Sequence, residues 1–295
     1  IDLNGKTING TQGDRNQPLF TEYLILNEGT ISAISNGTIH CVTQGTSYTG
    51  GPGEFAAIRN KGAIGEIVSL NVDVSETYGI GLKNIGTINT IKDSKFYSHD
   101  SSYPFYNYAI VNSGNINLIK GVELKAYEDS GSTKGRDTVA LVNSGKIGDM
   151  QDVTAYSNII GTTGATATAI NNTGEMVISS GNYNGTLSGG GLYTIGGGVF
   201  TTRPSFDMWK PGCIAVDNSD TTYLYTIEQN TTEYDKYPFV ASVANSDGTE
   251  TSYKSLTRAA IVAQNGGTVK LLQDVQGQQM VLRGSVTLDL NGYNI

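Results

Sequence analysis

A short pattern, Asn-x-Gly-x-(Ile/Met), recurs six times in the first two-thirds of the chain and constrains its fold more than any other feature. Successive copies are 33, 24, 28, 31 and 29 residues apart, and repeats of this length are typical of solenoid coils. The copies begin at Asn27, Asn60, Asn84, Asn112, Asn143 and Asn172. The sequence therefore predicts an elongated stack of similar coils.

Apolar residues keep fixed positions relative to each of these asparagines. One lies two residues before every Asn, and an Ile or Met lies four residues after it. In the first five copies the position seven residues after the Asn is also apolar, and so is the position twelve after it, within a stretch of alternating residues. Because such alternation is typical of a strand with one buried face, each coil is expected to hold two or three short strands separated by turns.

We interpret the six asparagines as a structural ladder. Stacked Asn side chains can hydrogen-bond to each other or to the backbone of the next coil. We also expect the Asn and Gly residues between strands to supply the positive φ angles that tight corners need, since glycine adopts such angles without a Cβ penalty.

Composition and charge exclude several classes of protein. The chain has 295 residues, with only 6 Pro and a regular periodicity, which excludes a disordered chain. Its apolar runs are all short, so no membrane insertion is predicted, and residue 1 does not begin a signal peptide. The formal net charge is −8 and basic residues are scattered, which argues against a nucleic-acid partner.

No cofactor or metal site is predicted. The glycine-rich stretches 189–191 and 196–198 lack the Lys-Ser/Thr of a phosphate loop. His40 and His99 are the only histidines and lie 59 residues apart, which gives no support to a histidine zinc site. Cys41 and Cys213 belong to distant coils, separated by roughly 25 Å at one strand spacing per layer, so we expect two separate buried thiols.

The two ends of the chain share one phrase. Residues 1–8 read Ile-Asp-Leu-Asn-Gly-Lys-Thr-Ile, and residues 288–295 read Leu-Asp-Leu-Asn-Gly-Tyr-Asn-Ile. We expect the chain to be one period of a longer tandem protein. The character of the sequence also changes near residue 237, where strand patterns flank a helical stretch near 255–264 that begins at Ser255 as an N-cap. This predicts a β-helix over residues 1–236, followed over 237–295 by a capping helix and the start of a second module.

The last segment carries a resemblance to a known family. Residues 253–275 (YKSLTRAAIVAQNGGTVKLLQDV) and 286–293 (VTLDLNGY) resemble a module of large adhesin-like surface proteins of Firmicutes. The coil pattern is similar to the right-handed parallel β-helix of the pectate-lyase-like (pectin lyase-like) superfamily. The resemblance implies a secreted or wall-attached bacterial protein, but the superfamily also holds polysaccharide lyases and glycosidases, so the fold does not select a function.

Carboxylates form one candidate site. Sixteen residues after the Asn, three successive coils carry Glu76, Asp100 and Glu128. If the register holds, neighbouring carboxylates stand about 5 Å apart, which is near the separation in retaining glycosidases. A cation site and ordinary solvated turns are the alternatives.

Aromatic residues form the other candidate site, which is a ligand-binding surface. Several lie within or beside the insert 101–108, and aromatic faces stack on sugar rings. The candidates are Tyr97, Tyr103, Phe105, Tyr106, Tyr108 and Tyr127, with Tyr156 nearby. In the alternative reading some of these rings pack against the coil beneath.

Together these patterns predict an all-β protein, a right-handed parallel β-helix of about eight coils with a short C-terminal segment containing one helix. We expect a non-catalytic, secreted or cell-surface segment that binds carbohydrate or a host glycoprotein through displayed loops. A polysaccharide-degrading enzyme that uses the stacked carboxylates is the first alternative, and a pure spacer is the second.

Overall fold

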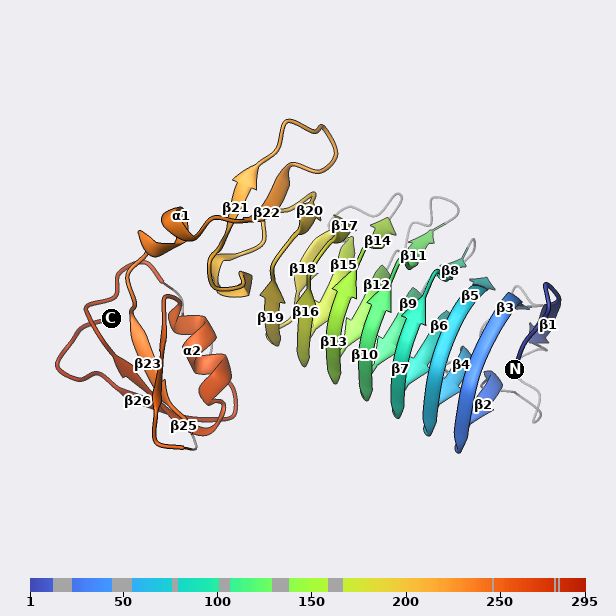
Figure 1. Ribbon diagram of the computed structural model, residues 1–295, viewed down its shortest axis with the longest axis horizontal. Helices are drawn as coiled ribbons and strands as arrows, with labels where there is room; N and C mark the ends of the chain where they lie inside the picture. The colour runs from blue at the N-terminus through green and yellow to red at the C-terminus, as the bar shows by residue number, and fades with distance from the viewer. Residues whose placement is uncertain are drawn as a thin grey trace, which may run out of the picture.

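The computed structural model describes residues 1–12, 23–43, 55–75, 79–100, 107–128, 138–158, 167–245, 247–278, 280 and 282–295. It is built mostly of strands, as Figure 1 shows. Within the described ranges, no helix is both long and apolar enough to cross a membrane.

Parallel strands stack in three faces that run along the molecule (Figure 1). The first face contains the first halves of β3 (Thr30–Thr43) and β5 (Ala63–Ser75), with β7 (Thr87–Lys92), β10 (Asn115–Lys120), β13 (Lys146–Gln151), β16 (Glu175–Ile178) and β19 (Leu192–Ile195). The second face contains β1 (Thr7–Gln12), the second halves of β3 and β5, β8 (Lys95–Asp100), β11 (Glu123–Glu128), β14 (Val153–Asn158), β17 (Gly181–Asn184) and β20 (Gly198–Phe200).

The third face is a separate sheet of seven strands. It contains β2 (Tyr23–Asn27), β4 (Phe55–Asn60), β6 (Gly79–Asn84), β9 (Asn107–Asn112), β12 (Thr138–Asn143), β15 (Thr168–Asn172) and β18 (Thr186–Ser188). Each chain turn passes once through every face, so the predicted all-β parallel β-helix is confirmed. The second face holds eight described layers from β1 to β20, in agreement with the predicted coil number.

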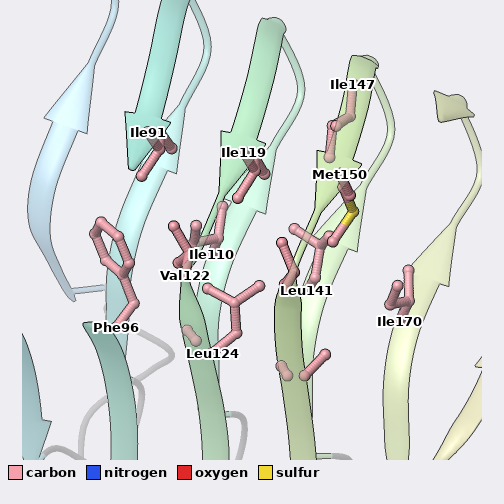
Figure 2. Packing of buried hydrophobic residues seen from close by; sticks show 14 of the residues in the cluster. Ile91, Phe96, Ile110, Ile119, Val122, Leu124, Leu141, Ile147, Met150 and Ile170 are labelled. Atoms are coloured by element: carbon pink, nitrogen blue, oxygen red, sulfur yellow. The ribbon is translucent and has the colours of Figure 1, made fainter. Parts of the chain in front are cut away.

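The core is a set of apolar columns parallel to the stack, as Figure 2 shows for part of it. The position seven residues after the ladder Asn is fully buried in five coils, and the position twelve after it is fully buried in the same five. These residues are Ile34, Ile67, Ile91, Ile119 and Met150 in the first column, and Ile39, Val72, Phe96, Leu124 and Ala155 in the second. The predicted buried positions of the repeat are confirmed.

The six motif asparagines form one hydrogen-bonded chain through the buried interior. Each of the first five donates from Nδ2 to Oδ1 of the next Asn, at 2.7 Å in every case. The same Nδ2 groups also donate to backbone carbonyls, as Asn84 does to Gly86 and Asn115 at 3.2 Å. Because buried amides are costly unless their groups are paired, the ladder satisfies side chains that point into the core.

The glycine of the motif has a different role from the one expected. None of the motif glycines has a positive φ, so the expectation of left-handed corners there is wrong. A Cβ added to Gly114 would instead lie 2.0 Å from the carbonyl oxygen of Gly86 in the previous coil, and the same 2.0 Å applies at Gly62, Gly86, Gly145 and Gly174. The backbones of stacked corners approach so closely that a side chain cannot fit between them.

Positive φ angles occur at another corner, nine residues after each Asn, where the chain passes from the first face to the second. The residues there are Asn36, Ser69, Asp93, Gly121, Asp152 and Gly181, all with positive φ. In β3 and β5 the strand continues through this bend, while in later coils it is interrupted. The sequence varies at this corner although the backbone conformation recurs.

The last coil is closed by antiparallel structure. β20 pairs with β22 (Tyr225–Gln229), and β22 pairs with β21 (Cys213–Asp217), both antiparallel. The short helices η1 (Phe206–Met208) and α1 (Thr231–Asp235) flank this hairpin. Residues 201–236 thus cover the edge of the stack rather than add coils, which protects an otherwise open strand edge.

Residues 237–295, the C-terminal unit, have their own small core. Its sheet, in the order β24–β23–β25–β26, combines β23 (Ala241–Ala244), β24 (Glu250–Tyr253), β25 (Asn265–Leu271) and β26 (Ser285–Asp289) with helix α2 (Leu256–Ala263). Ser255 caps α2 by accepting a hydrogen bond from the Arg258 amide at 3.2 Å, as the sequence predicts. The two cores divide between Ile227 and Val240, and the domain boundary at residue 236 stays a prediction.

One partly buried arginine joins the C-terminal unit to the last coil. The Arg258 guanidinium donates to the carbonyls of Tyr193 at 2.8 Å and Asp207 at 3.0 Å and to the Thr194 hydroxyl at 3.0 Å. Burial lowers the pKa of this guanidinium. Because removing a cation from water costs free energy unless it is hydrogen-bonded, these contacts fix α2 against the end of the β-helix.

Neither Cys41 nor Cys213 is in a disulfide, and both are buried, which confirms the prediction of two separate thiols. Burial raises the pKa of the Cys213 thiol. Both residues pack in the apolar core of the β-helix.

Candidate functional site

The second face brings together most of the described polar and aromatic candidates. Alternate residues of its strands point inward, as buried Val74, Ser98 and Ala126 do. The residues between them point outward and are only partly buried. We call the outward side chains of β3, β5, β8, β11 and β14 on this face the histidine–tyrosine face, which contains His40, Asp73, Tyr97, His99, Glu123, Lys125, Tyr127 and Tyr156.

Strand register sets the rows of this face. His40 pairs with Asp73, Asp73 with Tyr97, Tyr97 with Lys125, and Lys125 with Tyr156. All five lie thirteen residues after a ladder Asn. Adjacent members of such a row stand one strand spacing apart, about 4.8 Å.

Both histidines of the chain bind one aspartate. His40 Nδ1 lies 3.0 Å from Asp73 Oδ2, and His99 Nε2 lies 3.1 Å from Asp73 Oδ1. The hydrogen bond from His99 lowers the pKa of Asp73, and the charges of both imidazoles add to this effect against the opposing effect of burial. Ionised Asp73 therefore stabilises the fold above its unfolded-state pKa, and this contribution is lost as the pH falls through the folded-state value.

Sequence separation is therefore a poor guide to proximity in this fold. His40 and His99 are 59 positions apart in the sequence but only two coils apart, and Asp73 lies in the coil between them. His40 and Asp73 could have been found from the sequence by aligning the residues that lie thirteen positions after each Asn. Among the described residues, no group of three or more His, Cys, Asp and Glu side chains is arranged to hold a metal ion.

The aromatic side chains of this face take part in specific contacts. His99 and Tyr127 stack with ring centroids 5.0 Å apart and an interplanar angle of 6°. The Tyr97 hydroxyl donates to Glu123 Oε2 at 2.5 Å. Burial, this hydrogen bond and the Glu123 charge raise the pKa of Tyr97, so its hydroxyl stays protonated.

Glu123 is the centre of an ionic group beside Tyr97. Lys125 forms an ion pair with it, and Lys95 lies 3.7 Å away. Burial favours a higher pKa for this carboxyl, but the hydrogen bonds from Lys125 and Tyr97 outweigh it and lower the pKa. The Lys125 ammonium also lies 5.1 Å from the centre of the Tyr97 ring. These charges are paired within the face.

The predicted ligand-binding tyrosines do not all share this face. Tyr97, Tyr127 and Tyr156 belong to it, on the adjacent strands β8, β11 and β14. Tyr108 lies on β9 in the third face, in register with Ile80 and Val139. The other predicted aromatics, Tyr103, Phe105 and Tyr106, lie outside the described residues.

Two of the three predicted carboxylates have backbones in register. Asp100 and Glu128 pair directly at the ends of β8 and β11. Their side chains are not among the described ones, and Glu76 lies outside the described residues. The catalytic and cation readings of these carboxylates stay predictions.

A cleft lies at the joint between the β-helix and the C-terminal unit. Its lining includes Phe206, Ser255 and Arg283, and the Arg283 guanidinium packs against Gly190. None of the predicted site residues lines it. No protein-family model, curated protein or solved structure matches this chain.

Proposed function

We propose that this protein is a non-catalytic segment of a secreted, cell-surface-attached bacterial protein, whose histidine–tyrosine face binds carbohydrate or the glycan of a host glycoprotein. The observation that carries the proposal is the placement of outward Tyr97, Tyr127 and Tyr156 on three adjacent strands, with polar groups between them. Aromatic side chains combine apolar area with a polar end, which suits a sugar ring and its hydroxyls.

The scaffold supports this role because it holds the face rigid. The described inward side chains of the same strands are buried, and the face's charged groups are paired with each other. A binding site that is ordered before the ligand arrives loses less conformational entropy on binding. The placement at a bacterial surface rests on the resemblance of residues 253–295 to adhesin-like modules.

Binding to a panel of host and plant polysaccharides tests the proposal. We expect Tyr127→Ala and Tyr156→Ala each to weaken binding about tenfold, which corresponds to about 1.4 kcal/mol. Tyr223→Ala is the matched control, because Tyr223 lies outside this face and is also partly buried. If no polysaccharide binds, or if the control loses as much affinity, the protein is better described as a spacer.

A polysaccharide-degrading enzyme is the second candidate. Asp73, which two imidazoles flank at 3.0 and 3.1 Å, favours it because such a group can relay protons. Incubation with the same polysaccharides, followed by measurement of new reducing ends over a day, separates the two candidates. An enzyme forms new ends that are lost in Asp73→Asn, while a binding protein forms none.

A further inference from the structure

The phrase that occurs at both ends of the chain folds in the same way in both places. In residues 1–8, Asn4 and Gly5 have φ of 48° and 73°, and in residues 288–295 Asn291 and Gly292 have φ of 50° and 82°. The Asn4 and Asn291 amides each donate to the aspartate two residues earlier at 2.9 Å. Each phrase therefore forms the same left-handed turn, of a type found between strands, closed by a hydrogen bond from Lys6 to Leu3 in one copy and from Tyr293 to Leu290 in the other.

The two copies of the phrase form hydrogen bonds to neighbouring strands on opposite sides. In residues 1–8, Leu3 and Gly5 donate to the carbonyls of Ser35 and Asn36, and Thr38 donates to the Lys6 carbonyl, all in the coil that follows. Because N–H and C=O groups of successive strand residues point to alternate sides, the backbone groups of Thr7 point away from that coil.

In residues 288–295 the hydrogen bonds are made on the other side. Asn294, the counterpart of Thr7, donates from its amide to Asp274 Oδ1 at 2.8 Å and accepts at its carbonyl from the Val275 amide at 2.9 Å. Leu288 and Asp289 pair in parallel with Val269 and Lys270 of β25. The C-terminal unit thus occupies the edge on which residues 1–8 have no partner strand within the described part of the chain.

Burial of the phrase follows the same division. Leu3 packs against the core of the β-helix, whereas its counterpart Leu290 is 47% exposed. Leu288 packs against the core of the C-terminal unit, whereas its counterpart Ile1 is 55% exposed. The third residue of the phrase is therefore packed only in the N-terminal copy, and the first residue is packed only in the C-terminal copy.

We propose that two copies of the chain join in tandem and share one phrase. Residues 1–8 of the second copy then take the place of residues 288–295 of the first copy, and the C-terminal unit of the first copy docks on the first coil of the second. One phrase is then held on both sides, by the C-terminal unit of one copy and by β3 of the other. The termini lie at opposite ends of the long axis (Figure 1), so this head-to-tail contact continues the stack along that axis. Arg258 carries the connection back to the preceding β-helix.

A fused chain tests the proposal, in which residues 1–287 are followed directly by residues 1–295 so that the central phrase is single. The control has a flexible Gly–Ser linker inserted at the same junction. We expect amide hydrogen exchange at Leu3, Gly5 and Thr7 of the central phrase to be slow together, with Thr7 at least about tenfold slower than in the linker control. Small-angle scattering of the direct fusion should show one extended particle.

A point variant separates the two edges. In the direct fusion, Asp274→Ala in the first copy removes the acceptor for the Thr7 amide and should restore its fast exchange, while Leu3 and Gly5 stay protected by the second β-helix. The proposal is overturned if Thr7 exchanges equally in the fusion and the linker control. It is also overturned if scattering shows that the two halves move as freely in the direct fusion as in the control.

Discussion

Two corners of each coil both turn the chain from one face to the next, but they place different demands on the sequence. At the Asn-x-Gly corner the sequence is nearly invariant through six coils, yet the motif glycines have no left-handed backbone. At the corner nine residues later the backbone is left-handed in all six coils, yet the residue is Asn, Ser, Asp, Gly, Asp or Gly.

The two corners differ in their physical constraint, which is close packing at the first and a backbone angle at the second. The first corner stacks backbone on backbone and places a polar side chain in the core, so it selects one residue at each of two positions. The second corner requires only a φ angle that several short polar residues and glycine tolerate. Close packing thus restricts a position to one residue type, while a recurrent backbone angle allows several types and is harder to recognise in the sequence.

The largest expected effect is that of a single methyl group at the first corner. Gly114→Ala places a Cβ 2.0 Å from the Gly86 carbonyl oxygen and 2.6 Å from the backbone of Ile85, and backbone atoms cannot move aside singly. We expect a loss of about 3 kcal/mol or more in the free energy of unfolding. Urea unfolding followed by circular dichroism and by the fluorescence of the single tryptophan, Trp209, measures it.

The matched control is Gly29→Ala in the first copy of the same motif. A Cβ at Gly29 meets no atom within 4 Å, because it has no described corner stacked on its open side. The substitution should leave the unfolding free energy unchanged within about 0.5 kcal/mol. Equal losses at Gly29 and Gly114 would show that the motif glycine is required for its own backbone and not for stacking.

Removal of one ladder side chain should have the next largest effect. Asn112 accepts from Asn84 and donates to Asn143, both at 2.7 Å, and Asn112→Ala leaves a buried partner without its hydrogen bond on each side. We expect a loss of about 2 to 3 kcal/mol. Asn27→Ala, at the end of the ladder with only Asn60 as a ladder neighbour, should lose about 1 kcal/mol. The same urea titrations compare them, and equal losses would contradict a cooperative ladder.

At the second corner a side chain should cost less. Gly121 has φ of 62°, and an added Cβ would lie 2.9 Å from Asp93 Oδ1, the mobile end of a side chain. We expect Gly121→Ala to lose about 1 kcal/mol through the left-handed backbone alone. Gly121→Asn should lose less than half of this, since Asn tolerates that conformation. If Asn loses as much as Ala in parallel thermal melts, crowding and not φ limits this corner.

The sequence predicted the coil, the core and the ladder because each depends on local spacing. Ile67 and Ile91 are buried for the same reason in each coil, so a repeat reveals them. Of the histidine–tyrosine face, His40 and Asp73 escaped prediction, because His40, Asp73 and Tyr97 are of different residue types and only their common offset within the coil places them in one row. The reason for the motif glycine was missed because it depends on the distance between coils, which spacing along the chain does not give.

The smallest effect should come from exchanging a left-handed aspartate for glycine. Asp152 has φ of 52°, and its carboxylate accepts from Ser180 Oγ at 2.9 Å on the exposed surface. Asp152→Gly relieves backbone strain but loses that hydrogen bond and makes the unfolded chain more flexible, so the net change should stay within about 0.5 kcal/mol. Asp152→Val, with a branched Cβ at the same φ, should lose about 1 to 2 kcal/mol. Urea titration of both variants measures these losses. If only the backbone angle specifies the corner, glycine leaves the unfolding free energy nearly unchanged and valine lowers it. If the corner needs the Asp152 carboxylate, both variants lower it.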